Sequence, residues 1–497
     1  MKLNWLICLI MWAATCAGRA ADFPSLVLPQ GVGVNIHFTS GHERDLDLIA
    51  AAGFKFIRMD FSWGGTERQK GQYNWAAYEA LTRGLEQRGL SAIYILDYSN
   101  DLYEPGASPQ HPESVAAFAR WAGAAARHFK GRRILWEIWN EPNISFWKPK
   151  PDVHQYIALA KATCQAIREN DPEATIIAPA SSEFPWEFLE EMFKAGLLGQ
   201  LDGVSVHPYR HYQRGPETAA DDYLRLRSLI ERYAPPAKRA MPILSGEWGY
   251  ATHKDGVSLE TQAAFLARQQ LANLLHGVPL SIWYDWKNDG PNPDYNEHNF
   301  GTVYPDLRPK PAYEALQVLT RDLSGYRVAH RLDVGQPEAF VLLMVNPAGE
   351  QKLAVWSTQG ERVVSLDVGL SAPGSMKIVD GKGKSQPVNL QDRRLQLSLS
   401  PLPSYVTFNE RSPVLSAAAA WQIREPFPRS VKAGAEEGLT ITIALQNTFP
   451  HPVRAEASLA LPESTVRKTV ELDQGKSAEV KLAGPISRRD IAQIPVT

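Results

Sequence analysis

The stretch that decides the fold is Ile134-Leu135-Trp136-Glu137-Ile138-Trp139-Asn140-Glu141-Pro142-Asn143. It begins as an apolar run of branched and aromatic residues, which is typical of a buried strand, and it ends at a Pro-Asn breaker. Burying a carboxylate costs several kcal/mol unless it is compensated. Glu141, at the mouth of the strand, is therefore expected to serve chemistry, although a carboxylate that only caps the next loop is the alternative.

Strand-like and helix-like segments alternate on both sides of this stretch. Eight strand-helix units within about 300 residues predict a (β/α)8 barrel. A doubly wound open sheet is the rival, but no Gly-rich phosphate loop follows the first strand. The expected strands are 31–39, 54–61, 91–98, 134–143, 174–179, 201–207, 241–247 and 280–286, and the expected helices are 45–52, 75–88, 112–129, 153–170, 186–198, 219–233, 259–275 and 312–323.

The 497 residues are too many for one ordinary core, so several domains are expected. From about Tyr326 the pattern changes to short alternating segments split by Gly, Pro and Asn, which indicate an antiparallel β-sandwich. We expect a signal peptide over 1–20, the barrel over 21–325, the sandwich over 326–411, and a second immunoglobulin-like β module over 412–497 without a clear closing strand.

The N-terminus has the features of a secretory signal. Lys2 precedes an apolar segment over 3–14 that is too short to span a bilayer, and small residues before Ala21 fit a cleavage site. This predicts a secreted or periplasmic bacterial protein. Of three cysteines only Cys164 lies outside the signal, so no internal disulfide is expected.

Composition excludes several classes of partner. The formal net charge of −2 gives no electrostatic reason to expect nucleic acid, and no later apolar run is long enough for a membrane helix. No Cys/His spacing indicates a metal, and no cofactor is expected.

We expect a monomer. Its expected partner is a poly- or oligosaccharide, because polar groups and Trp faces converge at one end of the predicted barrel.

Chemistry in such a barrel lies at the C-terminal ends of the strands. Glu141 and Glu247 end the fourth and seventh strands across the barrel mouth. Two carboxylates about 5 Å apart give a glycosidase that retains anomeric configuration, and a gap of about 6.5–9.5 Å gives inversion. Glu137 is interpreted as a buried, paired structural acid. The further candidates at this rim are His37, Arg58, Asp60, Trp63, Asn140, Trp147, His207, Tyr209, Trp283 and Trp286.

The motifs 136–143 (WEIWNEPN), 205–209 (SVHPY) and Gly246-Glu247, with the C-terminal sandwich, resemble the retaining glycoside hydrolases of clan A, and most of all glycoside hydrolase family 39. That family includes β-xylosidases, α-L-iduronidases and exopolysaccharide-cleaving endoglycosidases. The resemblance covers roughly 31–409.

The resemblance implies a role for each matching residue. Glu141 would be the acid/base and Glu247 the nucleophile, and Asn140 would hydrogen-bond the sugar 2-OH. Tyr209 would donate to Glu247, with His207 nearby and Arg58 beneath it. Trp286 or Trp283 would form the floor under the sugar, of which strand parity lets only one face inward; Trp286 is preferred. For His37, Asp60, Trp63 and Trp147 sugar binding and structural packing stay open.

Three functions remain in competition. The first is a secreted or periplasmic glycosidase that acts on a polysaccharide. Aromatic residues along the rim favour an open groove and endo action, namely Trp63, Tyr98, Trp147 and Trp248. A non-catalytic carbohydrate-binding protein is the second hypothesis, which the intact acid pair disfavours. The third is a clan A enzyme of another family, such as an endoglucanase or mannanase.

Overall fold

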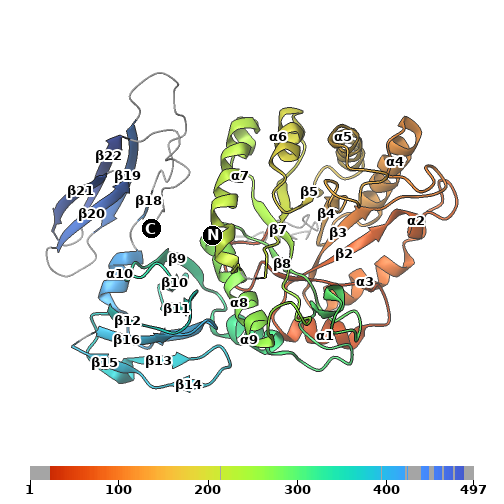
Figure 1. Ribbon diagram of the computed structural model, residues 1–497. Helices are drawn as coiled ribbons and strands as arrows, with labels where there is room; N and C mark the ends of the chain where they lie inside the picture. The colour runs from red at the N-terminus through yellow and green to blue at the C-terminus, as the bar shows by residue number, and fades with distance from the viewer. Residues whose placement is uncertain are drawn as a thin grey trace, which may run out of the picture.

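The computed structural model describes residues 23–212, 214–392, 394–419, 422–423, 438–446, 453–461, 464–473 and 476–485. The predicted signal peptide over 1–20 lies outside them. Figure 1 shows three parts along the chain: a large body of strands ringed by helices, a set of antiparallel sheets beside it, and a last set of strands.

The large body is a closed barrel of eight parallel strands in sequential order. Val32 pairs with Ser281, so the first strand closes on the eighth. The fold class expected from the alternating pattern is confirmed. The strands are β1 Val32–Asn35, β2 Phe56–Ser62, β3 Ser91–Asp97, β4 Ile134–Ile138, β5 Thr175–Ser182, β6 Gly203–His207, β7 Ile243–Trp248 and β8 Ser281–Trp283.

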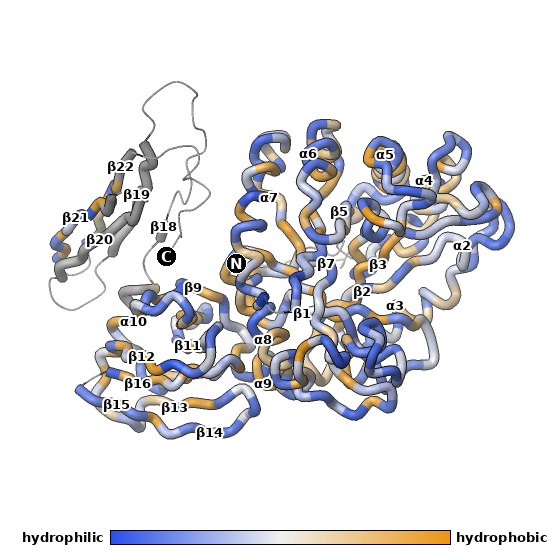
Figure 2. Tube along the Cα trace, in the orientation of Figure 1, coloured by the Kyte–Doolittle hydropathy of each residue, from blue (hydrophilic) through white to orange (hydrophobic). Residues whose placement is uncertain are grey.

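Two helices of the outer ring, α5 (Val153–Asn170) and α8 (Leu259–Leu275), start at residues whose side chains cap them. Asp152 accepts from the backbone N–H groups of His154 and Gln155, and Ser258 accepts from that of Thr261, as helix N-caps do. Figure 2 shows hydrophobic and hydrophilic residues alternating along most of the helices of the ring, as expected for helices that bury one face, whereas α8 is buried on all sides from Gln262 to Asn273. The helices of the ring are α1 Glu43–Ala51, α2 Trp63–Thr66, α3 Ala76–Gln87, α4 Pro112–His128, α5 Val153–Asn170, α6 Trp186–Lys194, α7 Ala220–Tyr233, α8 Leu259–Leu275 and α9 Pro311–Asp322.

The eighth strand is shorter than the expected 280–286. It ends at Trp283, so Trp286 lies beyond the strand in the following loop. Strand parity therefore does not govern where Trp286 points. Short 3₁₀ turns lie in the connections, among them η2 Pro216–Ala219 after β6 and η4 Asn296–Asn299 after β8.

Two antiparallel sheets follow the barrel and face each other over an aliphatic core that includes Val341, Leu353 and Leu397. One sheet has the order β14-β13-β17-β11-β10-β9 and the other β12-β16-β15. Their strands are β9 Arg327–Arg331, β10 Ala339–Val345, β11 Gln351–Ser357, β12 Arg362–Asp367, β13 Met376–Val379, β14 Ser385–Gln386, β15 Asn389–Gln391, β16 Arg394–Leu399 and β17 Ser404–Phe408.

Beyond the expected boundary at 411/412, helix α10 (Pro413–Ala419) packs on the sandwich through the buried Leu415. The last strands are β18 Gln422–Ile423, β19 Gly438–Gln446, β20 Val453–Leu461, β21 Ser464–Leu472 and β22 Ser477–Pro485, and they include the four segments expected there. No helix within the described ranges has the length and apolar character needed to cross a bilayer.

Candidate active site

Glu141 is held by an unusual backbone just past the end of β4. Trp139 has φ 67° and Glu141 has φ 47°, in the left-handed region that residues other than glycine rarely adopt. The Glu141 N–H donates to the Ala180 carbonyl oxygen at 2.9 Å, which fixes the turn. Such strained positions cost about 1–3 kcal/mol each and cluster at functional sites. The turn holds a carboxyl that is only 7% exposed.

Glu141 and Glu247 face each other across the barrel mouth. One oxygen of Glu141, one oxygen of Glu247 and one ring nitrogen of His207 all lie within 4.8 Å of one another. His207 Nδ1 is 2.9 Å from Glu141 Oε1 and 4.0 Å from Glu247 Oε1. The two carboxylates therefore lie close together, and the imidazole of His207, at the end of β6, lies beside both.

Glu247 accepts hydrogen bonds from a cation and a phenol. Arg58 Nη1 donates to Oε2 at 2.6 Å, and the Tyr209 hydroxyl donates to Oε1 at 2.8 Å. Burial and the adjacent Glu247 charge raise the pKa of Tyr209 well above its usual range, so the phenol stays a donor. Both expected contacts are present, and both are charge-assisted hydrogen bonds to a carboxylate.

Glu141 has the opposite environment. Burial raises its pKa to about 7, and the charge of Arg58 and a hydrogen bond from Ser182 reduce that rise only partly. Burial also lowers the pKa of His207 to about 4, so its ring is neutral near pH 7. A carboxyl that keeps its proton near neutral pH is suited to act as a general acid.

Arg58 organises the base of the site from β2. Its Nε donates to Glu137 Oε2 at 2.6 Å and its Nη2 donates to Asn140 Oδ1 at 2.7 Å. Ser205 donates to the other Glu137 oxygen, so this fully buried acid is paired as expected. Asn140 also donates through Nδ2 to the Tyr98 hydroxyl at 3.0 Å. The Arg58 guanidinium therefore links β2, which carries it, to β4 and β7.

A cavity of about 800 Å³ opens over these groups, a size typical of small-ligand sites. His37 and Asp60 lie in its wall, as do Arg58, Asn140 and Tyr209. Although burial opposes it, the hydrogen bond and charge of Asp285 raise the pKa of His37 to about 9. The wall is formed by Asn35, His37, Arg58, Asp60, Tyr98, Asn140, Glu141, Phe146, Ser182, Glu183, Tyr209, Arg210, His211, Tyr212, Glu247, Gly249, Tyr284, Asn296, Glu297 and Phe300.

Four tryptophans proposed from the sequence as sugar contacts, Trp63, Trp147, Trp283 and Trp286, do not line this cavity. Each is at most 1% exposed, as is the fifth expected rim aromatic, Trp248. Three of them use their indole N–H inside the protein, toward Glu67, Gln155 and Asp45 respectively for Trp63, Trp147 and Trp286. The expected sugar floor of Trp286 or Trp283 is therefore wrong, and for Trp63 and Trp147, where sugar binding and packing were both open, the structure shows packing and loop anchoring.

Other residues occupy the positions that these tryptophans were expected to fill. Tyr284, the first residue after β8 ends at Trp283, lines the cavity. Phe146 is 43% exposed and stacks on Tyr98 at 5.8 Å. Glu183 lies in the wall with φ 53°. No residue pattern separates these loop positions from their neighbours, since the loop conformation alone decides which side chain faces the cavity.

Two groups of side chains bring metal-ligand atoms near one another, namely His37 with Asp285 and Asp289, and His207 with Glu141 and Glu247. In both, the histidine already contacts a carboxylate, at 3.4 Å for His37–Asp285 and 2.9 Å for His207–Glu141. The second group is the acid pair itself.

Residues 25–290, more than half of the chain, match the family model described as cellulase (glycosyl hydrolase family 5). Among curated proteins, a β-xylosidase of Geobacillus stearothermophilus is 29% identical over 157 residues, 28% of this chain and 30% of its own. A β-xylosidase of Caldicellulosiruptor saccharolyticus is 22% identical over 252 residues, 47% of this chain and 50% of its own. The chain thus spans at most half the length of these curated relatives.

Among solved structures, a family 39 glycoside hydrolase from the gut symbiont Bacteroides cellulosilyticus is similar with a TM-score of 0.69 and 25% identity, over 78% of this chain and 82% of that one. A family 39 β-xylosidase from Caulobacter crescentus has a TM-score of 0.56 at 17% identity, over 79% and 99% respectively, which is a likeness of fold alone. The resemblance to clan A, and to family 39 in particular, is confirmed.

Proposed function

The chain belongs to the family described as cellulase (glycosyl hydrolase family 5), a clan A family, and from that premise we propose that it is a retaining glycosidase. The observation that carries the proposal is the pair Glu141 and Glu247, whose nearest side-chain oxygens lie within 4.8 Å in opposite environments. This separation matches the carboxylate pair of retaining enzymes, whereas inverting enzymes leave room for a water between the acids.

The two environments support a different role for each acid. Glu247, held by Arg58 and Tyr209, attacks the anomeric carbon while the bond to the leaving oxygen breaks. Glu141, protonated near neutral pH, gives its proton to that oxygen. Water then attacks the anomeric carbon of the glycosyl ester and releases Glu247, and Glu141 takes the proton of that water, so both acids return to their starting states.

Hydrogen-bonding residues around the pair would hold the sugar. Asn140 is fixed by Arg58 and Tyr98 and presents its amide beside Glu141, where we propose that it binds the 2-OH. His37 and Asp60 lie in the same wall and offer a donor and an acceptor for other hydroxyls. We propose a β-xylosidic linkage as the first substrate to test, since the curated relatives are β-xylosidases.

We propose endo action on a poly- or oligosaccharide. Phe146 supports it, because this aromatic side chain is 43% exposed at the cavity wall and offers its surface to a second sugar ring. Product sizes early in the digestion of a long xylan test this point. Endo cleavage releases a range of intermediate lengths, whereas release of only one small product would assign exo action.

The double displacement is tested by product stereochemistry and by trapping. Proton NMR of the first product should show the substrate's anomeric configuration, and an inverted product would refute the mechanism. A 2-deoxy-2-fluoro-β-xyloside should add one glycosyl mass to a peptide that contains Glu247. The Glu247→Gln variant should gain no mass, while Glu113→Gln, an exposed site on α4, should be labelled like wild type.

We propose further that the protein is exported after cleavage near Ala21 and acts as a monomer. The apolar segment over 3–14 supports the first point. A Caulobacter crescentus neighbour described as a monomeric β-xylosidase supports the second. N-terminal sequencing of the protein from the periplasm or medium and sedimentation of the purified chain test these two proposals.

A further inference from the structure

One of the contacts between the β-sandwich and the barrel is made by Glu217, in the β6–α7 connection. Trp356, on β11, donates its indole N–H to Glu217 Oε1 at 2.8 Å. Arg268, on α8, donates to the same carboxylate through Nε and Nη2, both at 2.7 Å. Trp356 is fully buried and Arg268 is 2% exposed. A single carboxylate therefore joins the sandwich, α8 and the loop after β6.

The sandwich side of this contact is rigid. The Trp356 ring stacks on Phe340 with centroids 4.8 Å apart and an interplanar angle of 14°. The Arg331 guanidinium lies 3.6 Å from the centre of the Phe340 ring. This aromatic stack is covered by the protein's own residues and has no open face for a sugar. The polar atom of the Trp356 ring is its indole N–H, which donates to Glu217.

The barrel side is equally confined. A Cβ on Gly215 would lie 2.6 Å from Arg268 Nη2 and 2.8 Å from Glu217 Oε2, so the backbone passes tightly against the ion pair. The Thr218 N–H donates to the Gly215 carbonyl oxygen at 3.2 Å, and this bond forms the start of the turn η2. Tyr250, from the loop after β7, donates to the Arg214 carbonyl at 2.9 Å. The end of the loop after β6 is therefore held by several contacts around Glu217.

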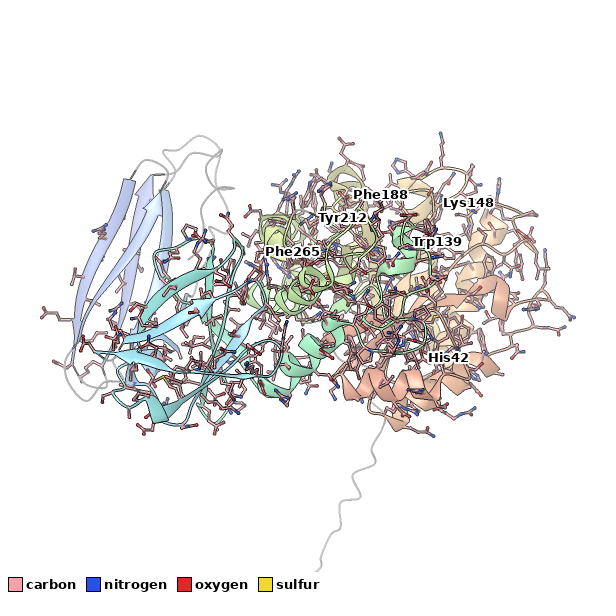
Figure 3. All side chains as sticks on the ribbon, turned by 60° about the horizontal axis from the view of Figure 1, so that its bottom comes forward. His42, Trp139, Lys148, Phe188, Tyr212 and Phe265 are labelled. Carbon is pink, nitrogen blue, oxygen red and sulfur yellow. The ribbon has the colours of Figure 1, made fainter. Side chains whose placement is uncertain are left out.

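This loop forms one wall of the substrate cavity. Tyr209, Arg210, His211 and Tyr212 all line it, and Tyr209 donates to Glu247. Arg210 is fixed to α7 through Asp222 at 2.6 Å. In Figure 3 the labelled Tyr212 and Phe265 lie on the half of the barrel nearer to the sandwich. The connection after β6 therefore contacts the nucleophile through Tyr209 at its start and the sandwich through Glu217 at its end.

We propose that the β-sandwich positions this wall through Trp356, Glu217 and Arg268, and that it thereby sets the affinity for substrate while leaving the chemical step to the barrel. Trp356 and Glu217 are positioning residues, because neither lines the cavity. The expected effect on substrate affinity rests on the proposed glycosidase function. The expected effect on the order of the loop after β6 is independent of that function.

The test uses the full-length protein and two variants on the same strand. Trp356→Phe keeps an aromatic ring beside Phe340 and removes the N–H donor together with part of the indole ring. Lys352→Met is the matched control, because Lys352 also reaches the barrel from β11 but contacts the Asp322 carbonyl and the Tyr326 ring, not the loop after β6. Hydrogen exchange by mass spectrometry follows the amides over 209–215, and steady-state kinetics use xylotetraose.

In Trp356→Phe we expect exchange over 209–215 to accelerate about tenfold, the effect of one charge-assisted hydrogen bond on local opening. KM should rise about fivefold with kcat changed less than about twofold. Lys352→Met should change neither the exchange over 209–215 nor the KM. Equal exchange in wild type and Trp356→Phe, or equal acceleration in both variants, would overturn the proposal. If wild type leaves xylotetraose uncut, the proposed β-xylosidic linkage fails while the exchange result still decides the positioning role.

Discussion

Replacing Glu141 by Gln should change how stability depends on pH. The Glu141 carboxyl is 7% exposed, and burial raises its pKa from 4.5 to about 7. In the unfolded chain the same carboxyl is solvated and keeps its ordinary value. Gln has nearly the same shape and does not titrate, so the variant removes this one linkage between protonation and folding.

The sign follows from the two pKa values. Below about pH 4.5 Glu141 is protonated in both the native and the unfolded state, so it does not lower the free energy of unfolding. Between about pH 4.5 and 7 the native state binds more protons than the unfolded state, so stability falls as pH rises. Above about pH 7 both states are ionised and the full cost is present. At about 1.4 kcal/mol per pKa unit, the rise from 4.5 to about 7 corresponds to about 3 kcal/mol.

Urea unfolding followed by tryptophan fluorescence from about pH 4 to about pH 8 measures this effect. The free energy of unfolding of Glu141→Gln minus that of wild type should grow by about 3 kcal/mol across this range. Glu113→Gln, at a side chain that is 74% exposed, serves as the control and should differ from wild type by a constant amount. A constant difference for Glu141→Gln would refute the view that burial keeps this carboxyl protonated.

Three further outcomes are expected. Tyr209→Phe should lower kcat about tenfold or more with a smaller change in KM, because Glu247 loses one of its two donors; initial rates on an aryl β-xyloside measure this. Arg58→Lys should lower kcat/KM more than about a hundredfold, since an ammonium cannot reach Glu247 and its other partners at once, and an unchanged value would contradict the assigned geometry. Trp286→Phe should lower the free energy of unfolding by about 1–3 kcal/mol through loss of the bond to Asp45, and leave KM unchanged.

Local sequence was sufficient for the acid pair because both residues are tied to strand ends. Glu141 follows an apolar run that can only be a buried strand, and Glu247 ends another. A closed barrel places all such ends on one rim. Arg58 and Tyr209 also follow from this logic, since each is fixed to a strand or lies within two residues of its end. The resemblance to clan A then supplied the roles proposed for them.

Local sequence failed for the aromatic wall because loops have no fixed period. Trp286 was expected at the cavity and Trp147 was left open between a sugar platform and a loop anchor, yet each turns inward to bond with Asp45 or Gln155 respectively. Phe146, the immediate neighbour of Trp147, lines the cavity instead. One residue of shift in a loop reverses which side chain is exposed, and nothing in the composition distinguishes the two.

The sequence by itself determined the barrel, the sandwich and the acid pair, because hydrophobic periodicity and strand order are local properties that a closed sheet converts into fixed positions. Only the tertiary structure decided the separation of Glu141 and Glu247, the raised pKa of Glu141 and the contact of Trp356 with Glu217. These depend on distances between residues that lie far apart in the chain and on the burial that packing creates. The stretch 134–143 therefore sets the position of the acid, and its surroundings set its charge.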